Sequence, residues 1–178
     1  DGSINGNIID DIFDGTRDDL LRYSPWNFAT SRVELARSAT APAFEFDYAY
    51  TLPADWIRTI SVHSNNAGHG AMSHRMEVIG SQRVIVCSAD QVFLRYVKRE
   101  KDPSLWSADF RRVMSLALAR DLAVPISSSN TLQDQLSKQF EKTMNRVRST
   151  DAMGGSPESR PRGSWVNNRG RSRRDGFL

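Results

Sequence analysis

The sequence predicts an α+β protein: a helical bundle of about four helices, with an inserted antiparallel β-domain and an extended C-terminal arm. Apolar residues recur at helical spacing near both ends of the chain, whereas they alternate with polar residues between positions 44 and 98. The last 25 residues follow neither pattern. The predicted divisions are the first half of the bundle (1–43), the inserted β-domain (44–100), the second half of the bundle (101–153) and the extended basic arm (154–178).

Two helices are expected before the sheet. Within residues 7–23, isoleucine and phenylalanine recur three to four positions apart, and Leu20 and Leu21 continue the same face two turns later. Pro25 interrupts this helix. A second, short helix is predicted over residues 26–36, and its apolar members are Trp26, Phe28, Val33 and Leu35.

The spacing of apolar residues changes to two at Phe44, where aromatic residues begin to alternate with polar or small ones. This alternation predicts a half-buried strand, and several β-rich segments follow it. Gly80 to Arg83 separates two of these segments and reads as the turn of a hairpin. The sequence therefore predicts four or five antiparallel strands, drawn from residues 44–50, 56–62, 76–79, 84–87 and 92–98.

Two further helices are predicted after the sheet. Asp102-Pro103 is a helix start signal, and the following segment to Leu122 is apolar on more than one side. Pro125 is expected to end this helix. Thr131 is a suitable N-cap for a last helix, which runs to about residue 151 before Gly154-Gly155. This order of elements predicts that the helices form one bundle and that the sheet protrudes from it.

Charge is unevenly distributed along a chain whose net charge is +3. Residues 1–24 hold six acids and two arginines, whereas residues 154–178 hold six arginines and two acids. Complementary ends favour contact between copies, or the arm folding back on its own first helix; the alternative is that both ends are simply solvated. The candidate subunit contacts are Asp10, Asp11, Asp14, Asp18 and Asp19. The candidate partner-docking residues of the arm are Pro157, Arg160, Arg162, Gly163, Ser164, Trp165 and Arg169.

No motif in the sequence indicates catalysis or cofactor binding. Neither a glycine-rich phosphate loop nor a Gly-x-Ser-x-Gly elbow occurs. The lone cysteine, Cys87, lies in an apolar strand, where a buried structural thiol is expected. His63, His69 and His74 could in principle bind a metal, but no carboxylate lies between them, so incidental surface histidines are favoured. We expect no enzyme activity, no cofactor, no metal and no membrane segment.

Several short motifs occur in an order typical of one family. They are residues 23–29 (YSPWNFA), 50–55 (YTLPAD), 102–106 (DPSLW), 122–126 (LAVPI), 155–157 (GSP) and 163–165 (GSW). In this order and spacing, the chain resembles the tail tubular protein A family of short-tailed bacteriophages, which form the head-to-tail adaptor below the portal.

The resemblance implies a virion structural protein, made in the cytoplasm of the host bacterium and without catalytic activity. It implies a homo-oligomeric ring, typically of twelve copies, between the portal protein and the tail nozzle protein. The arm around Pro157 and Trp165 would reach the portal, and double-stranded DNA would pass through the lumen without sequence recognition. Two alternatives remain from the residues themselves: a nucleic-acid-binding accessory protein that uses the arginine-rich arm, and an enzyme built on the histidine loop.

Overall fold

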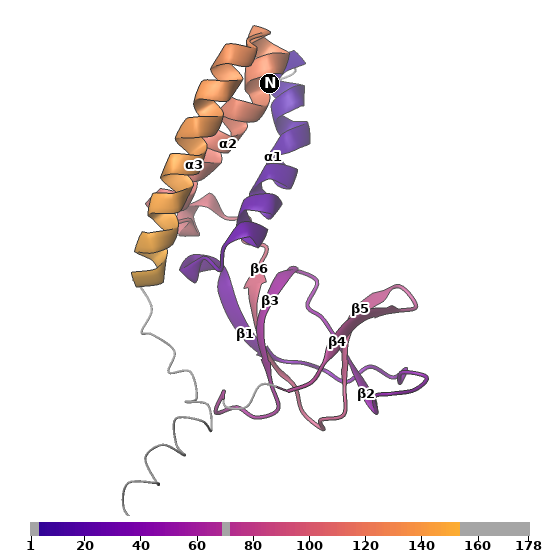
Figure 1. The fold of residues 1–178 in the computed structure, drawn as a ribbon. Coiled ribbons are helices and arrows are strands. Elements are labelled where there is room, and N and C mark those ends of the chain that lie inside the picture. The colour runs from indigo at the N-terminus through magenta and orange to yellow at the C-terminus, as the bar shows by residue number, and fades with distance from the viewer. Residues whose placement is uncertain (1–3, 69–71, 154–178) are drawn as a thin grey trace, which may run out of the picture.

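The computed structural model describes residues 4–68 and 72–153 (Figure 1). The helices lie at one end of the molecule and the strands at the other. Two short 3-10 helices precede β1 and α2. The elements are α1 (Ile4–Tyr23), η1 (Asn27–Ala29), β1 (Thr30–Glu34), β2 (Tyr48–Thr51), β3 (Trp56–His63), β4 (Arg75–Ile79), β5 (Gln82–Cys87), β6 (Phe93–Lys98), η2 (Pro103–Leu105), α2 (Ala108–Ser127) and α3 (Asn130–Met153).

The described residues form three α-helices and two three-stranded antiparallel sheets, so the prediction of a bundle of about four helices is wrong. Helices and strands are segregated, as in a mixed α+β protein. The error lies at residues 26–36, which form the turn η1 and the strand β1 instead of a helix. The hydroxyl of Thr30 donates to the carbonyl of Trp26 at 2.9 Å, and the backbone of Thr30 is extended. Pairing of β1 with β6, far away in the sequence, overrides the local helical spacing.

Pro125 does not end its helix, because α2 continues to Ser127. The proline lies in the last turn and lacks the N–H that would donate to the carbonyl of Asp121, and the helix ends two residues later. Ser128 then adopts a left-handed conformation (φ 52°), and its N–H donates to the Val124 carbonyl at 2.9 Å. The side chain of Ser127 donates to the carbonyl of Ala123, and the chain turns back into α3.

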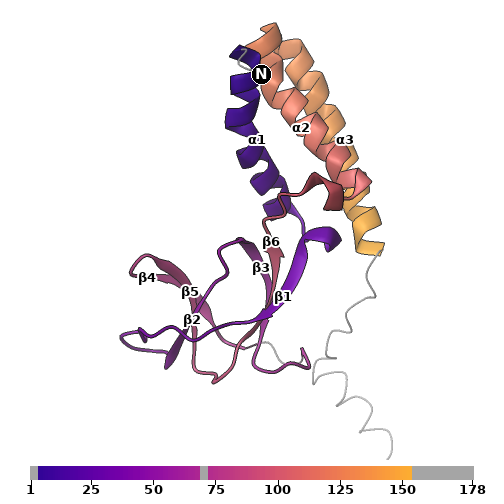
Figure 2. The ribbon, with the colours of Figure 1, turned by 180° about the vertical axis from the view of Figure 1, so that it is seen from behind.

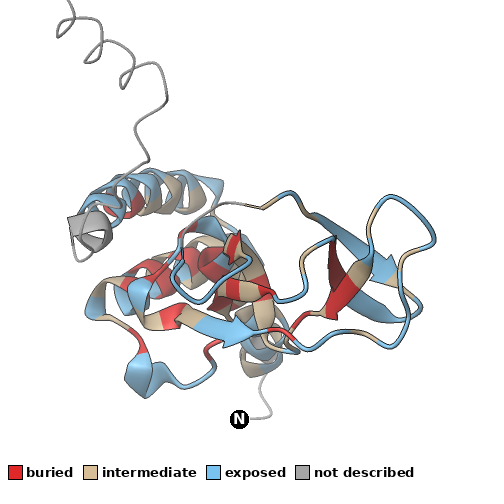
Figure 3. Ribbon diagram, turned by 90° about the horizontal axis from the view of Figure 1, so that it is seen from below, coloured by how far each residue is buried: buried red, intermediate tan, exposed pale blue. Residues whose placement is uncertain are grey.

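The first sheet has the order β1-β6-β3, and the second sheet has the order β2-β5-β4. One buried cluster joins the helices to β3 and β6 through Ile57 and Val97. A second buried cluster joins the two sheets through Leu94 of β6 and Ile85 of β5. Figure 2 shows from behind how the helices lie at one end and the two sheets at the other, and Figure 3 shows that the loops at the sheet end are mostly exposed.

An aromatic cluster fills the space between the helices and the first sheet. Trp26, 1% exposed, packs edge-on against Phe110 with ring centroids 5.0 Å apart. Phe28 and Trp106 contact the same phenylalanine at the same centroid distance. The indole N–H of Trp26 donates to the carbonyl of Leu20 at 2.8 Å. This bond satisfies one of the carbonyls left open at the end of α1, and it fixes the exit of the chain from that helix.

Ion pairs connect α1 to the residue that follows β6. Arg17 is only 3% exposed, and its guanidinium donates to Asp14 at 2.7 Å and to one oxygen of Asp18 at 2.8 and 3.0 Å. The other oxygen of Asp18 accepts from Nε of Arg99 at 2.7 Å. Asp18 therefore bridges two arginines from different layers. We call Arg17, Asp18 and Arg99 the junction network.

A second ion pair lies where β6 leads into η2. Lys98 donates to Oε2 of Glu100 at 2.6 Å, and this hydrogen bond holds the pKa of the Glu100 carboxyl below its ordinary value. The backbone N–H of Asp102 also donates to Glu100, at 3.1 Å, and favours the ionised form. The carbonyl of Glu100 accepts from the indole N–H of Trp106 at 3.1 Å, which connects this turn to the aromatic cluster.

We expect Glu100→Gln to lower the free energy of unfolding by about 1 kcal/mol at about pH 7. Because the folded pKa of Glu100 is depressed, its contribution is present above the unfolded pKa and is lost as the pH falls through the folded pKa. Urea unfolding of both proteins at a series of pH values should show the difference closing in acid. A difference that stays constant down to about pH 2.5 would contradict the role of this carboxylate.

Candidate interaction surfaces

The predicted docking residues of the arm lie outside the described residues, as does His69. The arm residues concerned are Pro157, Arg160, Arg162, Gly163, Ser164, Trp165 and Arg169. Their role therefore remains a prediction from the sequence.

The five predicted acidic contacts all lie on α1, but they are not equivalent. Asp10, Asp11, Asp14 and Asp19 are exposed, whereas Asp18 is partly buried in the junction network. The side chain of Asp14 is 70% exposed although it pairs with Arg17. Four carboxylates of α1 are therefore exposed and available to another molecule. Asp18 instead forms ion pairs with Arg17 and Arg99 within the same molecule, and the local sequence does not show this difference.

Exposed apolar side chains gather at the end of the helical layer that lies away from the sheets. In Figures 1 and 2, α1 begins at this end and α2 turns into α3 there. Ile9 of α1 is 36% exposed, and Ile126 near the end of α2 is 46% exposed. We treat these exposed apolar residues, which come from several elements at one end, as a candidate interaction site. We call this set the helical-tip patch: Ile9, Val124, Ile126 and Leu132.

The second sheet and the loop before it expose another apolar set. Phe44 is 81% exposed, and Met76 and Val78 on the edge strand β4 are 43% and 67% exposed. A groove of about 750 Å³ runs beside Met76 and Val78, and Trp56 of β3 also lines it. We call Phe44, Met76 and Val78 the sheet-end residues.

Phe44 owes its exposure to the backbone that follows it. Glu45 has a positive φ of 72°, and the N–H of Phe46 donates to the Phe44 carbonyl at 2.9 Å. These values describe a tight γ-turn, which is a strained conformation for a residue other than glycine. The carboxylate of Glu45 lies 3.3 Å from Arg75 at the start of β4. The predicted strand over 44–50 therefore starts only at Tyr48, and its first aromatic residue projects outward.

The sequence also singled out Cys87, His63 and His74 as candidate reactive or metal-binding residues. Cys87 is buried as predicted, and burial raises the pKa of its thiol. His63 contacts Ser61, with Nε2 and Oγ 2.9 Å apart, and Nδ1 of His74 lies 3.0 Å from the carbonyl of Met72. Within 4–68 and 72–153, no group of three or more histidine, cysteine or acidic side chains is placed to hold a metal ion.

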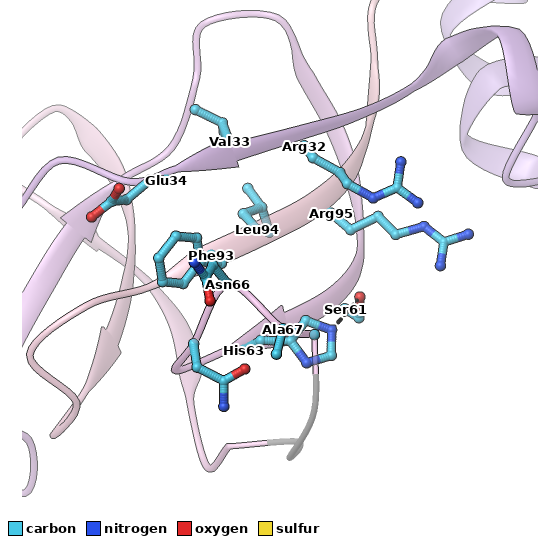
Figure 4. Close-up of a pocket in the computed structure, with 12 residues that line it drawn as sticks. Arg32, Val33, Glu34, Ser61, His63, Asn66, Ala67, Phe93, Leu94 and Arg95 are labelled. Atoms are coloured by element: carbon cyan, nitrogen blue, oxygen red, sulfur yellow. Dashed lines mark hydrogen bonds between the residues drawn. The ribbon is translucent and has the colours of Figure 1, made fainter. Parts of the chain in front are cut away.

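Sequence reasoning missed one cluster completely. Arg32 on β1 and Arg95 on β6 are paired with each other on neighbouring strands of the first sheet (Figure 4). No local signal could have revealed this pair, because residues 26–36 have a helical spacing and the two arginines are far apart in the chain.

No family model matches the chain, and no curated protein matches it. Among the helices of the described residues, none combines the length and the apolar character needed to cross a bilayer.

Proposed function

We propose that the chain is a structural adaptor subunit of a phage head-to-tail connector. In this role it forms a ring with copies of itself, typically twelve, and joins the portal protein to the tail nozzle protein. DNA passes through the ring without sequence recognition. The protein acts as a component of the virion and performs no catalysis.

One observation supports this role most directly: exposed apolar residues lie on two separate parts of a single packed body, at the helical tip and on the second sheet with the loop before it. The helical-tip patch and the sheet-end residues are joined by the aromatic cluster and by the junction network. A protein that joins two partners needs a binding surface for each partner and a rigid connection between the two surfaces. The exposed carboxylates of α1 add charged groups that a neighbouring copy could contact.

The resemblance to the tail tubular protein A family names the partners. It assigns the helical bundle and the arm around Trp165 to the portal and to neighbouring subunits, and the sheet domain to the nozzle and to adjacent subunits. On this assignment the helical-tip patch contacts the portal side and the sheet-end residues contact the nozzle side. The two sets should therefore be separable by mutation.

Substitutions at the two ends test this proposal. We expect Ile126→Lys combined with Leu132→Lys to weaken binding to the portal at least about tenfold, because charged side chains would have to be buried in the interface. Phe44→Ser combined with Val78→Thr should weaken binding to the nozzle instead. Since all four side chains are exposed, the free subunit should keep its stability within about 0.5 kcal/mol.

The matched control is Leu105→Lys, because Leu105 is 56% exposed and belongs to neither set. Co-sedimentation with purified portal and nozzle measures binding, and negative-stain images measure ring formation. If both double variants assembled like the wild type, neither set would be an interface and the adaptor proposal would lose its support. Loss of thermal stability in the free subunit would show that the substitutions had damaged the fold instead.

A further inference from the structure

We propose that the free edge of β4 takes up an extended strand of the nozzle protein that carries apolar and acidic side chains. The inference rests on the adaptor function and deepens it, because it states how the sheet-end residues bind their partner. In this contact the backbone of Met76 and Val78 pairs with the incoming strand, and the groove beside these residues selects its side chains.

The hairpin of β4 and β5 determines which backbone groups of β4 point outward. Only two residues separate the strands, and Ile79 is paired with Gln82 at the turn. A pair that closes a two-residue turn exchanges both of its N–H···O bonds, and the next pair along an antiparallel ladder exchanges none. The register continues without a shift to the start of β4. The N–H and C=O groups of Met76 and Val78 therefore point away from β5.

These outward-pointing groups lie on an edge that the described residues leave unpaired. β4 is the last strand of its sheet, and no backbone hydrogen bond outside the ladder with β5 joins Met76 or Val78 to residues 4–68 or 72–153. The side chains of both residues are exposed as well, at 43% and 67%. An unpaired strand edge is a template for another extended chain, and β4 has neither a proline nor a bulge that would block pairing.

The groove of about 750 Å³ lies along this edge. Residues 76–78 of β4 and residues 56–59 of β3 line it. Successive side chains of a strand point to opposite faces, so consecutive lining residues place the groove beside the edges of both strands. β3 is also the last strand of its sheet, and the hydroxyl of Thr59 lies 3.8 Å from the sulfur of Met76. A strand that pairs with β4 here has β3 as its other wall.

The charged residues of the groove favour an acidic partner. Arg22, Arg58 and Arg83 line it, against the single carboxylate of Glu77. Among the described residues, none of the three arginines pairs with a carboxylate. Arg58 donates to the carbonyl of Arg22 at 3.1 Å, and the guanidinium carbon of Arg83 lies 5.7 Å from the centre of the Trp56 ring. These contacts leave guanidinium N–H groups that can donate to carboxylates of another chain.

The same lining disfavours two other occupants. Trp56, Met76 and Val78 provide apolar surface beside the arginines, so a strand with both apolar and acidic side chains matches the groove. Residues 154–178 hold six arginines and two acids, so their charge has the same sign as that of the groove. Pairing of β4 with β4 of a second copy would bring the arginines of two grooves together. The nozzle protein is the partner that the adaptor function places at the sheet-end residues.

A peptide tests the edge of β4 without the nozzle. The isotopically labelled full chain is titrated with an acetylated and amidated heptapeptide in which valine alternates with glutamate, and separately with the same peptide carrying lysine in place of glutamate. We expect the acidic peptide to slow hydrogen exchange at the N–H groups of Met76 and Val78, and the lysine peptide to bind at least about tenfold more weakly. Equal binding of the two peptides, or no protection of these N–H groups at about 1 mM acidic peptide, would overturn the proposal.

Two substitutions at position 78 separate the backbone from the side chain. Val78→Pro removes an outward N–H, whereas Val78→Thr keeps it, and an edge strand tolerates proline where the N–H faces solvent. We expect Val78→Pro to weaken binding of the acidic peptide and of purified nozzle at least about tenfold, and Val78→Thr to weaken it about threefold or less. Glu77→Pro is the control for the register, because the N–H of Glu77 points toward β5. If Val78→Pro destabilised the chain more than Glu77→Pro, the assignment of the outward groups would be wrong.

The charges of the groove are tested by Arg58→Gln combined with Arg83→Gln, which leaves the backbone of β4 unchanged. This variant should bind the acidic peptide and the nozzle about fivefold more weakly, and the remaining binding should depend less on salt. The control is Arg111→Gln combined with Arg112→Gln, two exposed residues of α2, which removes the same charge elsewhere. Equal weakening in the variant and the control would contradict recognition of carboxylates by the groove.

The nozzle measurements separate this inference from the adaptor function. If the nozzle bound the wild type and Val78→Pro equally well, strand addition would be overturned and the adaptor function would stand. If the nozzle bound neither, the adaptor function would fail together with the assignment of the strand to the nozzle, and the peptide would still report on the edge of β4. Protection of Met76 and Val78 in the free chain that disappeared in a chain cut after Met153 would show that residues 154–178 fill the groove, and would also overturn the proposal.

Discussion

Replacing Trp26 by alanine should lower the free energy of unfolding by about 4 kcal/mol, the largest effect expected of any single substitution described. Trp26 is among the largest fully buried side chains, and it contacts both Phe28 and Phe110. Its removal leaves a cavity between the helices and the first sheet. It also leaves the Leu20 carbonyl without its indole donor at the end of α1.

Trp26→Phe separates these two contributions. Phenylalanine retains most of the apolar volume but cannot donate to Leu20, so a loss of about 1–2 kcal/mol is expected. Chemical denaturation monitored by circular dichroism measures both variants. If Trp26→Ala cost less than about 1.5 kcal/mol, the aromatic cluster would not hold the helices to the sheet in solution.

Breaking the junction network should produce the second-largest loss. We expect Asp18→Ala to cost about 3 kcal/mol, because it removes the acceptor shared by Arg17 and Arg99 and leaves the buried Arg17 with only Asp14. Arg99→Gln alone should cost less, about 1 kcal/mol, since Arg99 is more exposed than Arg17.

A double-mutant cycle on Asp18 and Arg99 measures the coupling between the helical layer and the first sheet. The coupling energy should be about 1 kcal/mol, and the matched pair Arg120 and Asp121, adjacent on α2, should give a value near zero. If the free-energy effects of the substitutions at Asp18 and Arg99 were strictly additive, the contact between the two side chains would not persist in solution. A lower denaturant slope in Asp18→Ala would show that the helices and the strands had begun to unfold separately.

The sequence predicted those elements whose stability is local. The hairpin of β4 and β5 follows from two β-rich segments that flank a turn at Gly80, and α3 follows from its apolar stripe. The strand β1 was not predictable in the same way. Its residues have both helical and extended preferences. They become a strand because they pair with β6, which lies too far along the chain to be seen in a local stretch of sequence.

The candidate surfaces were predictable only in part. The acidic character of α1 is visible in the sequence, but the separation of Asp18 from its exposed neighbours depends on Arg99, which lies far away in the chain. The exposure of Phe44 depends on one backbone angle at Glu45, and alternation alone suggested a strand there. The opposed arginines on the first sheet follow from strand register, which the sequence did not specify.

The pairing of β1 with β6 also sets the order in which the chain can fold. As the polypeptide leaves the ribosome, residues 30–34 have no partner until residues 93–97 emerge about sixty residues later. The hairpins β4–β5 and α2–α3 close over short distances and can form early, whereas the first sheet must wait. During this interval Trp26 and Ala29 lack the strand and helix that bury them in the folded protein, so this apolar surface stays exposed until the last part of the core is made.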